Sequence, residues 1–410
     1  MKIAIVYDPV YPWSKGGGEK ALWELSAELV RSGHEIHYFG MRHWGKPATI
    51  RRAGVHIHGV CPDVPLYAKS GRRSMAEPLL FAAGLLRAFW RMRRERFDVV
   101  NCISFPYASV LVVALLRALG IIRAKFAVTW LEVWGREYWR DYLKSPLLAH
   151  AASALERACA ALGDSHICIS ELTRSRLGEL LGVPAARSAT IPFGIHGDEG
   201  PASPATKSRG ACVTAARLVE HKNVTVFVDA WPEVLRQCPG ATAVIIGEGP
   251  LSGELRSLIA RRRLGDSIVL AGWLDRDKLI REIARAEILV HPSTREGQGL
   301  VALEAMALGT AVVAARHPEN AITDFLRDGE NGLLINEYAD PKFWAAAIVG
   351  LLRDHARREL IAANATRTAL GFDWQSGIVA RYIGHLETLR AQNRPPPPQE
   401  GPAGQSPTRC

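Results

Sequence analysis

Short runs of apolar residues alternate along the chain with longer segments in which apolar residues recur at helical spacing. The longer segments predict helices, for example at 19–32 and 105–119. Runs that are apolar throughout are typical of strands in a parallel sheet that helices cover on both faces. The first half of the chain therefore predicts a doubly wound α/β domain. Its predicted strands are 3–7, 35–39, 98–100, 125–130, 166–170 and 189–194.

A change of composition follows this pattern. Residues 196–210 are rich in Gly, Pro, Ser and Thr and hold almost no large apolar side chain, which indicates a linker. The alternation then resumes and predicts a second, similar α/β domain, with a cleft between the two at the carboxyl ends of the strands. The later strands are 211–217, 242–247, 267–272, 287–293 and 310–315. The expected parts are 1–195, the linker 196–210, 211–371, a helix at 372–390 that crosses back to the first domain, and a disordered Pro-rich tail at 391–410.

The composition excludes several classes of protein. The 410 residues are 48% hydrophobic and 22% charged, as in a packed globular chain. Seven cysteines without a CxxC pair argue against a disulfide framework or a structural zinc site and favour a reducing cytosol. The first apolar run breaks at Asp8 and Pro9, so it predicts a buried strand and not a secretion signal. The longest apolar stretch, 105–116, is shorter than the roughly 20 residues of a membrane span. We therefore expect a cytoplasmic protein.

The net charge of +10 indicates an anionic partner: a nucleic acid, an acidic membrane surface or a phosphorylated ligand. Charge is the sole feature that would favour nucleic acid, so we expect none to bind. The segment 79–97 combines apolar residues with many arginines and could lie as an amphipathic helix on an anionic membrane, peripherally. In the alternative reading Phe89, Trp90 and Met92 face the core and the arginines are simply solvated. The arginines concerned are Arg72, Arg73, Arg87, Arg91, Arg93, Arg94 and Arg96.

The stretch HPSTREGQGLVALEAMALGT (291–310) carries the clearest chemistry. A strand leads into a Gly-rich turn and then a helix, whose free N-terminal amides suit a phosphate. Glu296 lies in the turn and Glu304 about one turn into the helix, so both could accept hydrogen bonds from hydroxyls beside that phosphate. The alternative is that Glu304 merely caps or solvates the helix.

Two other turns follow predicted strands. In AARLVEHKN (215–223), Arg217 and Lys222 could point at one anion, although a pair of solvated surface cations is the simpler reading. In IIGEGP (245–250), Gly247 and Gly249 allow a ligand or another strand to approach the backbone closely, unless this is an ordinary turn.

These motifs occur along the chain in the order AARLVEHKN, IIGEGP, AGW and HPSTREGQGLVALEAMALGT. Their order resembles that in the nucleotide-sugar-binding half of glycosyltransferase family 4. The two glutamates fit the family's Glu–seven residues–Glu motif, and the flanking EGxGL and EAMAxGT words also match. In the first half, YPWSKGGGEKALWELSAELVRSGHEIHYF, SELTRSRL (170–177) and IPFGI (191–195) resemble family words, so the resemblance covers most of the chain. It implies the GT-B architecture, with an N-terminal acceptor-binding and a C-terminal nucleotide-sugar-binding Rossmann-like domain.

The resemblance also implies roles for individual residues and retention of the sugar's anomeric configuration. It needs no metal and no cofactor, because arginine and lysine supply the positive charge. The residues implied in catalysis are Glu296 on the transferred sugar and Arg217 and Lys222 on the diphosphate. Those implied in donor binding are Gly247, Glu248, Trp273, Leu274, Gly297, Gly299, Leu300, Val301 and, on the ribose, Glu304. The resemblance also implies a loop that approaches the acceptor and the phosphates, formed by Gly16, Gly17, Gly18 and Glu19.

One residue departs from the family pattern. The segment TWLEVWGREYW (129–139) places Leu131 where the family has a histidine near the donor sugar. Leucine can neither donate a hydrogen bond nor move a proton, so activity rests on the phosphate clamp, another group substitutes, or the protein is impaired. Glu132 is adjacent, but strand alternation would point it to the opposite face. His196, in place of the commoner aspartate, is a minor departure.

We therefore expect a retaining glycosyltransferase that moves a hexosyl group from a nucleotide-diphospho-sugar, most simply a UDP-sugar, to a hydroxyl. A lipid-linked sugar, a polysaccharide or a natural-product precursor would each fit as acceptor. The alternatives are a catalytically impaired sugar-nucleotide-binding protein and a non-hydrolysing sugar-nucleotide epimerase, whose architecture is the same. A nicotinamide-dependent oxidoreductase would need a GxGxxG spacing that the GGGE sequence lacks.

Overall fold

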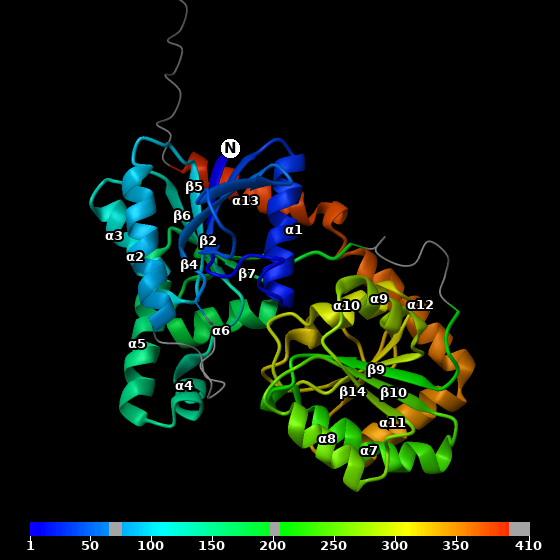
Figure 1. Cartoon of the computed structure of the whole chain (residues 1–410). Helices are drawn as coiled ribbons and strands as arrows, with labels where there is room; N and C mark the ends of the chain where they lie inside the picture. Colours follow the sequence, from blue (N-terminus) through cyan, green and yellow to red (C-terminus); the bar gives the residue numbers. More distant parts are fainter. Residues whose placement is uncertain (65–75, 197–205, 393–410) are drawn as a thin grey trace, which may run out of the picture.

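The computed structural model describes residues 1–64, 76–196 and 206–392. Figure 1 shows two α/β domains, each a twisted sheet with helices packed on its faces. Most of the predicted linker and nearly all of the predicted tail, like Arg72 and Arg73, lie outside the described residues. Among these residues no helix combines the length and the apolar character that crossing a membrane requires.

The first sheet has the strand order β3-β4-β2-β1-β5-β6-β7-β8, parallel except for the edge pair β3–β4. Its strands are β1 (Lys2–Val6), β2 (Glu35–Arg42), β3 (Thr49–Arg52), β4 (Val55–Pro62), β5 (Val99–Ile103), β6 (Lys125–Trp130), β7 (Ser165–Cys168) and β8 (Ser188–Thr190). Its helices are α1 (Gly17–Arg31), α2 (Ala76–Arg91), α3 (Tyr107–Ala118), α4 (Gly135–Leu143), α5 (Pro146–Leu162) and α6 (Glu171–Leu181), with the short turn η1 (Ala185–Arg187).

The second sheet is wholly parallel, in the order β11-β10-β9-β12-β13-β14. The strand order reverses between β9 and β12, and ligands of such sheets bind at this reversal. The strands are β9 (Ala211–Ala215), β10 (Thr242–Ile246), β11 (Ile268–Gly272), β12 (Ile288–His291), β13 (Ala311–Ala315) and β14 (Leu333–Ile335). The helices are α7 (Val224–Gln237), α8 (Ser252–Arg261), α9 (Arg276–Arg285), α10 (Leu300–Ala307), α11 (Pro341–Arg353) and α12 (His355–Leu370), with the turns η2 (Glu220–Lys222) and η3 (Ala321–Asp324).

Three strands were not predicted from the sequence, namely β3, β4 and β14. In β4, imidazoles at His56 and His58 alternate with apolar residues, so no continuous apolar run marks it. Several predicted strands extend too far: β12 ends at His291, because Pro292 has no N–H to continue the ladder. The basic helix expected at 79–97 is α2, which ends at Arg91.

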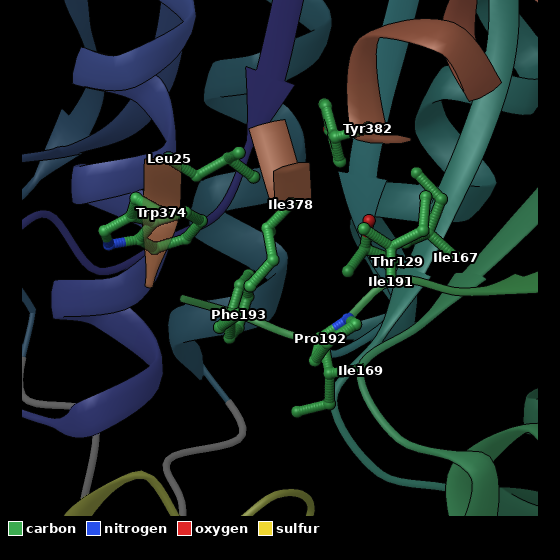
Figure 2. A pocket seen from close by; sticks show the side chains of 10 residues that line it. All are labelled: Leu25, Thr129, Ile167, Ile169, Ile191, Pro192, Phe193, Trp374, Ile378 and Tyr382. Carbon is green, nitrogen blue, oxygen red and sulfur yellow. The ribbon is translucent and has the colours of Figure 1, made fainter. Parts of the chain in front are cut away.

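The end of the chain returns to the first domain. The helical turn η4 (Trp374–Ile378) and α13 (Val379–Ala391) lie against that domain's sheet and α1 (Figure 1). Figure 2 shows Trp374, Ile378 and Tyr382 around a small apolar pocket with Leu25 of α1 and with Phe193. Polar bonds also fix the contact: for example, Asn101 Nδ2 donates to the Tyr382 hydroxyl at 2.7 Å, and the Trp374 indole donates to Glu24 at 3.2 Å.

Buried histidine makes the first domain sensitive to acid. His166 in β7 is fully buried, and its Nδ1 accepts a hydrogen bond from the Trp130 indole at 3.0 Å. Burial, with a smaller effect of Arg187, lowers the pKa of His166 to about 4. The pKa of an unfolded histidine is about 6.5, so between those two values the unfolded chain binds a proton that the folded chain does not. This group's contribution is therefore fully present above about pH 6.5 and is lost as the pH falls, by about 3 kcal/mol at pH 4.

We expect the variant His166→Gln, whose amide oxygen can still accept from Trp130, to have a flatter dependence of Tm on pH between about 6.5 and 4. Differential scanning calorimetry of the two proteins across that range measures the difference. Parallel profiles would show that His166 is not the group that titrates.

Candidate active site

Three loops of the second domain are tied together where β9, β10 and β11 end. The amide of Ala216 donates to Ile246 O at 3.0 Å, that of Leu218 to Glu248 O at 2.9 Å, and that of Gly247 to Gly272 O at 2.8 Å. Gly247 has a φ of 131°, and a Cβ there would collide with the carbonyl oxygen of Ala216. The sequence needs glycine at this position because the Arg217 loop passes so closely over it.

Glu296 lies in the turn after β12, in an ion-pair cluster. Its Oε1 is 2.5 Å from Lys222 Nζ and 3.0 Å from His291 Nε2, with only 13% of the side chain exposed. Burial opposes ionisation of this carboxyl, but Lys222 and His291 outweigh it and hold the pKa of Glu296 well below its usual range. Glu296 is therefore an anion at neutral pH and a ready acceptor for hydroxyl hydrogen bonds.

Glu304 lies one turn into α10, which begins after Gly299, a left-handed residue with φ 87°. Its Oε1 is 2.8 Å from Arg276 Nη2 of α9 and 3.7 Å from Lys20 Nζ of α1. The side chain is 11% exposed, so Glu304 is not simply a solvated helix residue. Contact with Lys20 means that this carboxylate faces the first domain across the cleft.

The N-termini of two helices meet at this point. Gly17 begins α1, and a Cβ on it would lie 3.5 Å from the side chain of Leu300, which begins α10. Each helix N-terminus carries a partial positive charge and free backbone N–H groups. The carboxylate of Glu19 folds back over Gly16, next to the start of α1. Gly18 lies beside Leu131, whose Cδ1 would be 3.5 Å from a Cβ at Gly18.

Glu132 does not point away from the cleft, so that expectation was wrong. Strand β6 ends at Trp130, and the alternation of faces ends with it. Glu132 Oε2 accepts hydrogen bonds from Arg295 Nε at 3.0 Å and from the Trp134 indole at 3.1 Å. The Arg295 guanidinium also lies 3.5 Å from the centre of the Tyr138 ring. A small interdomain pocket is lined by Glu132, Arg176, Arg295, Glu296, Gly297 and Glu319.

The remaining predicted residues lie around the rim. Trp273 is 46% exposed, and Lys15 of the first domain places its Nζ 3.5 Å from the indole ring. Glu248 and Arg217 are exposed on their loops, whereas Leu274 and Val301 pack partly into the core of the second domain. A Cβ on Gly297 would collide with the carbonyl oxygen of Leu131, so the two domains touch at this turn.

Several polar residues of the site were missed in the sequence. Lys20 and Arg276 flank Glu304, His291 flanks Glu296, and Arg295 bridges to the first domain. A signal existed for His291, since it ends a strand at the edge where ligands bind. Lys20 and Arg276 lie in ordinary charged helix faces, and their partner comes from a different domain or loop.

Two parallel-sheet domains that face each other across a cleft, with a helix N-terminus from each domain meeting there, have the GT-B architecture. The family model described as "Glycosyl transferase 4-like domain" matches residues 16–194, and "Glycosyl transferases group 1" matches residues 209–354. Together they span most of the chain, which belongs to the GT-B glycosyltransferases of the family 4 type.

Individual relatives differ in coverage. D-inositol 3-phosphate glycosyltransferase of Acidothermus cellulolyticus is 34% identical over 52% of this chain, and the match spans only about half of that relative, 52%. Glycogen synthase of Mycobacterium tuberculosis is 29% identical over 97% of both chains. Among solved structures, sucrose-phosphate synthase from Thermosynechococcus elongatus has a TM-score of 0.77 at 19% identity and covers 94% of this chain and 98% of its own. Anabaena HepE with UDP and glucose has a TM-score of 0.72 at 20% identity, covering 95% and 100%. These structures share the fold.

Proposed function

We propose that the protein is a retaining glycosyltransferase that transfers a hexosyl group from a nucleotide-diphospho-sugar, a UDP-sugar in the simplest case, to a hydroxyl acceptor. The observation that carries this proposal is the meeting of the α1 and α10 N-termini beside Lys222, Glu296 and Glu304. Positive groups there suit a diphosphate, and the two carboxylates on either side suit the hydroxyls of a sugar and a ribose.

The proposed reaction breaks the bond between sugar C1 and the diphosphate oxygen. The acceptor oxygen bonds to C1 on the same face, and its proton passes to an oxygen of the leaving diphosphate. Arg217 and Lys222 stabilise the negative charge that develops on that diphosphate, and Glu296 orients the sugar. These side chains supply the electrostatic stabilisation, so we propose that no metal and no cofactor take part.

The choice of donor draws support from related proteins. Solved structures of the same fold contain UDP with glucose in HepE and ADP with acarbose in a plant starch synthase. A mannosyltransferase of Mycobacterium tuberculosis that is 30% identical over 48% of this chain is named as dependent on GDP-mannose. The base is therefore the first property to measure.

A thermal-shift screen against UDP, GDP, ADP, NAD and the common UDP- and GDP-sugars tests the donor. A ligand at 100 times its dissociation constant adds about 2.7 kcal/mol of stability, which raises Tm by several degrees. We expect a selective shift with UDP and UDP-sugars. A shift with NAD alone would overturn the proposal.

Leu131 supports a second candidate, a sugar-nucleotide-binding protein without turnover. Its side chain packs against Gly18, and leucine at the position of the family's histidine can neither donate a hydrogen bond nor move a proton. Binding of a nucleotide sugar without release of free nucleotide, over a wide panel of acceptors, would favour this candidate. Release of nucleotide at an ordinary enzymatic rate would favour the transferase.

We further propose that the first domain rests on an anionic membrane surface, where a lipid-linked acceptor would be available. Helices α2, α3 and α5 expose large apolar side chains, and Trp90 of α2 is 53% exposed while Phe89 is buried in the core. Arg87, Arg91, Arg93 and Arg94 are exposed at the same end of α2. The exposed leucines are Leu79, Leu80, Leu86, Leu111, Leu115, Leu119, Leu147, Leu148, Leu155 and Leu162.

Vesicle co-sedimentation checks this surface. We expect the protein to bind vesicles that contain phosphatidylglycerol and not vesicles of phosphatidylcholine alone. The double change Arg91→Glu with Arg94→Glu should weaken this binding at least about tenfold, because each surface cation contributes about 1 kcal/mol. The matched control, Arg256→Glu with Arg261→Glu on α8, should bind like the wild type. Equal losses in both double variants would assign the effect to net charge instead of this surface.

A further inference from the structure

A cluster of imidazoles lies at the edge of the first sheet that is remote from the cleft. Glu35 and His37 are on β2, and His56 and His58 on β4, with His37 and His56 paired in register. These residues stand near the N-terminal ends of their strands, whereas the loops of the cleft follow the C-terminal ends. Among the described residues, ligand atoms of Glu35, His37 and His56 lie within 4.8 Å of one another.

A chain of hydrogen bonds orients the central ring. His37 Nδ1 is 2.9 Å from His58 Nε2, and His58 Nδ1 is 3.1 Å from the hydroxyl of Thr49 on β3. If each Nδ1 carries the proton, His37 donates to His58 and His58 donates to Thr49. His37 Nε2 then presents a lone pair toward Glu35 Oε1, which is 2.9 Å away. In this tautomer both atoms are acceptors, and a cation bound to both would relieve their repulsion.

We propose that Glu35, His37 and His56 bind a divalent transition-metal ion of the zinc class. Two imidazoles and one carboxylate form a ligand set that such ions prefer, and water would complete the coordination. His58 and Thr49 would fix the tautomer of His37, as outer partners do for metal-bound histidine. The ion would tie β2 to β4 and is separate from the proposed donor site.

The surroundings fit this assignment. Glu35 is half exposed, so an ion has a path from solvent, while the aromatic ring of Phe97 meets the edge of His37 with centroids 5.2 Å apart. Lys2 is the competing cation, since its Nζ lies 3.0 Å from Glu35 Oε1 and 2.6 Å from Glu95 Oε2.

The alternative is a metal-free network in which His37 Nε2–H donates to Glu35 and His58 Nε2–H donates to His37. Titration of the full-length, untagged protein with Zn²⁺ against a chromophoric chelator distinguishes the two. We expect one ion per chain and a rise in Tm with Zn²⁺ but not with Mg²⁺. The absorption spectrum of bound Co²⁺ should report nitrogen and oxygen ligands.

Variants locate the ion. His56→Ala removes a half-buried ligand and should weaken Zn²⁺ binding at least about tenfold, and His58→Phe should weaken it about 10–100-fold through the orientation of His37. Lys2→Gln should strengthen binding, because it removes the competing ammonium. His150→Ala, at an exposed histidine of α5, is the matched control and should change nothing. The proposal is overturned if the wild type binds no stoichiometric Zn²⁺, or if His56→Ala binds it as tightly as His150→Ala.

Discussion

Replacing Lys222 by alanine is expected to lower turnover of the nucleotide sugar about 10²- to 10³-fold, the usual cost of removing one group that stabilises charge in a transition state. The variant enzyme would lose two contributions of Lys222 at once. In the proposed reaction its ammonium supplies positive charge for the departing diphosphate. It also lies 2.5 Å from Glu296, which keeps His291 as a close partner when the lysine is removed. Turnover is measured as release of free nucleotide from the donor that the thermal-shift screen selects.

Loss of the buried ion pair also destabilises the fold, so the experiment needs a variant that separates the two effects. Lys222→Ala combined with Glu296→Gln removes both charges, and we expect it to regain much of the lost Tm while staying inactive. Lys278→Ala, at a lysine 60% exposed in the same domain, should keep full turnover. Turnover of Lys222→Ala within threefold of the wild type would contradict the assigned site.

Gly297→Ala is expected to lower turnover about 10²-fold by holding the two domains apart. A methyl group there would collide with the carbonyl oxygen of Leu131 in the first domain, which is backbone and cannot rotate away. A displacement of about 1 Å between reacting groups is enough for a loss of that size. The methyl group would also come within 3.3 Å of Ile169 Cδ1, the flexible end of a core side chain, so we expect only a small loss in Tm.

Small-angle scattering of Gly297→Ala should show a larger radius of gyration than that of the wild type. Its affinity for UDP should fall less than about tenfold, because the loops after β9, β10 and β11 are unchanged. Gly253→Ala in α8, where a Cβ meets nothing within 4 Å, is the control and should resemble the wild type in every measurement. Normal turnover with a normal radius would mean that this contact does not limit closure.

The fold could be predicted from the sequence because strands that are buried on both faces appear as continuous apolar runs. The run 125–130, for example, coincides with β6, and the words around Glu296 placed a turn before a helix correctly. The apolar pattern failed at β4, where histidines interrupt it, and at the cleft side of β6. There Glu132 lies two residues beyond Trp130, the last paired residue of β6, so the alternation of faces no longer applied.

The electrostatic partners of the site could not be predicted in the same way. Glu304 belongs to the second domain and Lys20 to the first, so the two residues are far apart in the sequence. No local sequence pattern around either residue indicates that they lie in contact. Glu296 was predicted to accept hydrogen bonds from hydroxyls, but its close pairing with Lys222 depends on how the turn η2 approaches β12. Local patterns report which elements form, whereas these contacts depend on how two sheets are placed against each other.

The return of the last helix to the first domain has a consequence for biosynthesis. Trp374, Ile378 and Tyr382 belong to the core that contains Leu25 and Phe193, although about 180 residues separate Phe193 from Trp374. A nascent chain that has just emerged as far as Phe193 therefore leaves part of its own core exposed on the ribosome. The second domain, which is contiguous in sequence, is the first that can complete its fold, and the domain made first must wait until the segment of η4 and α13 has emerged.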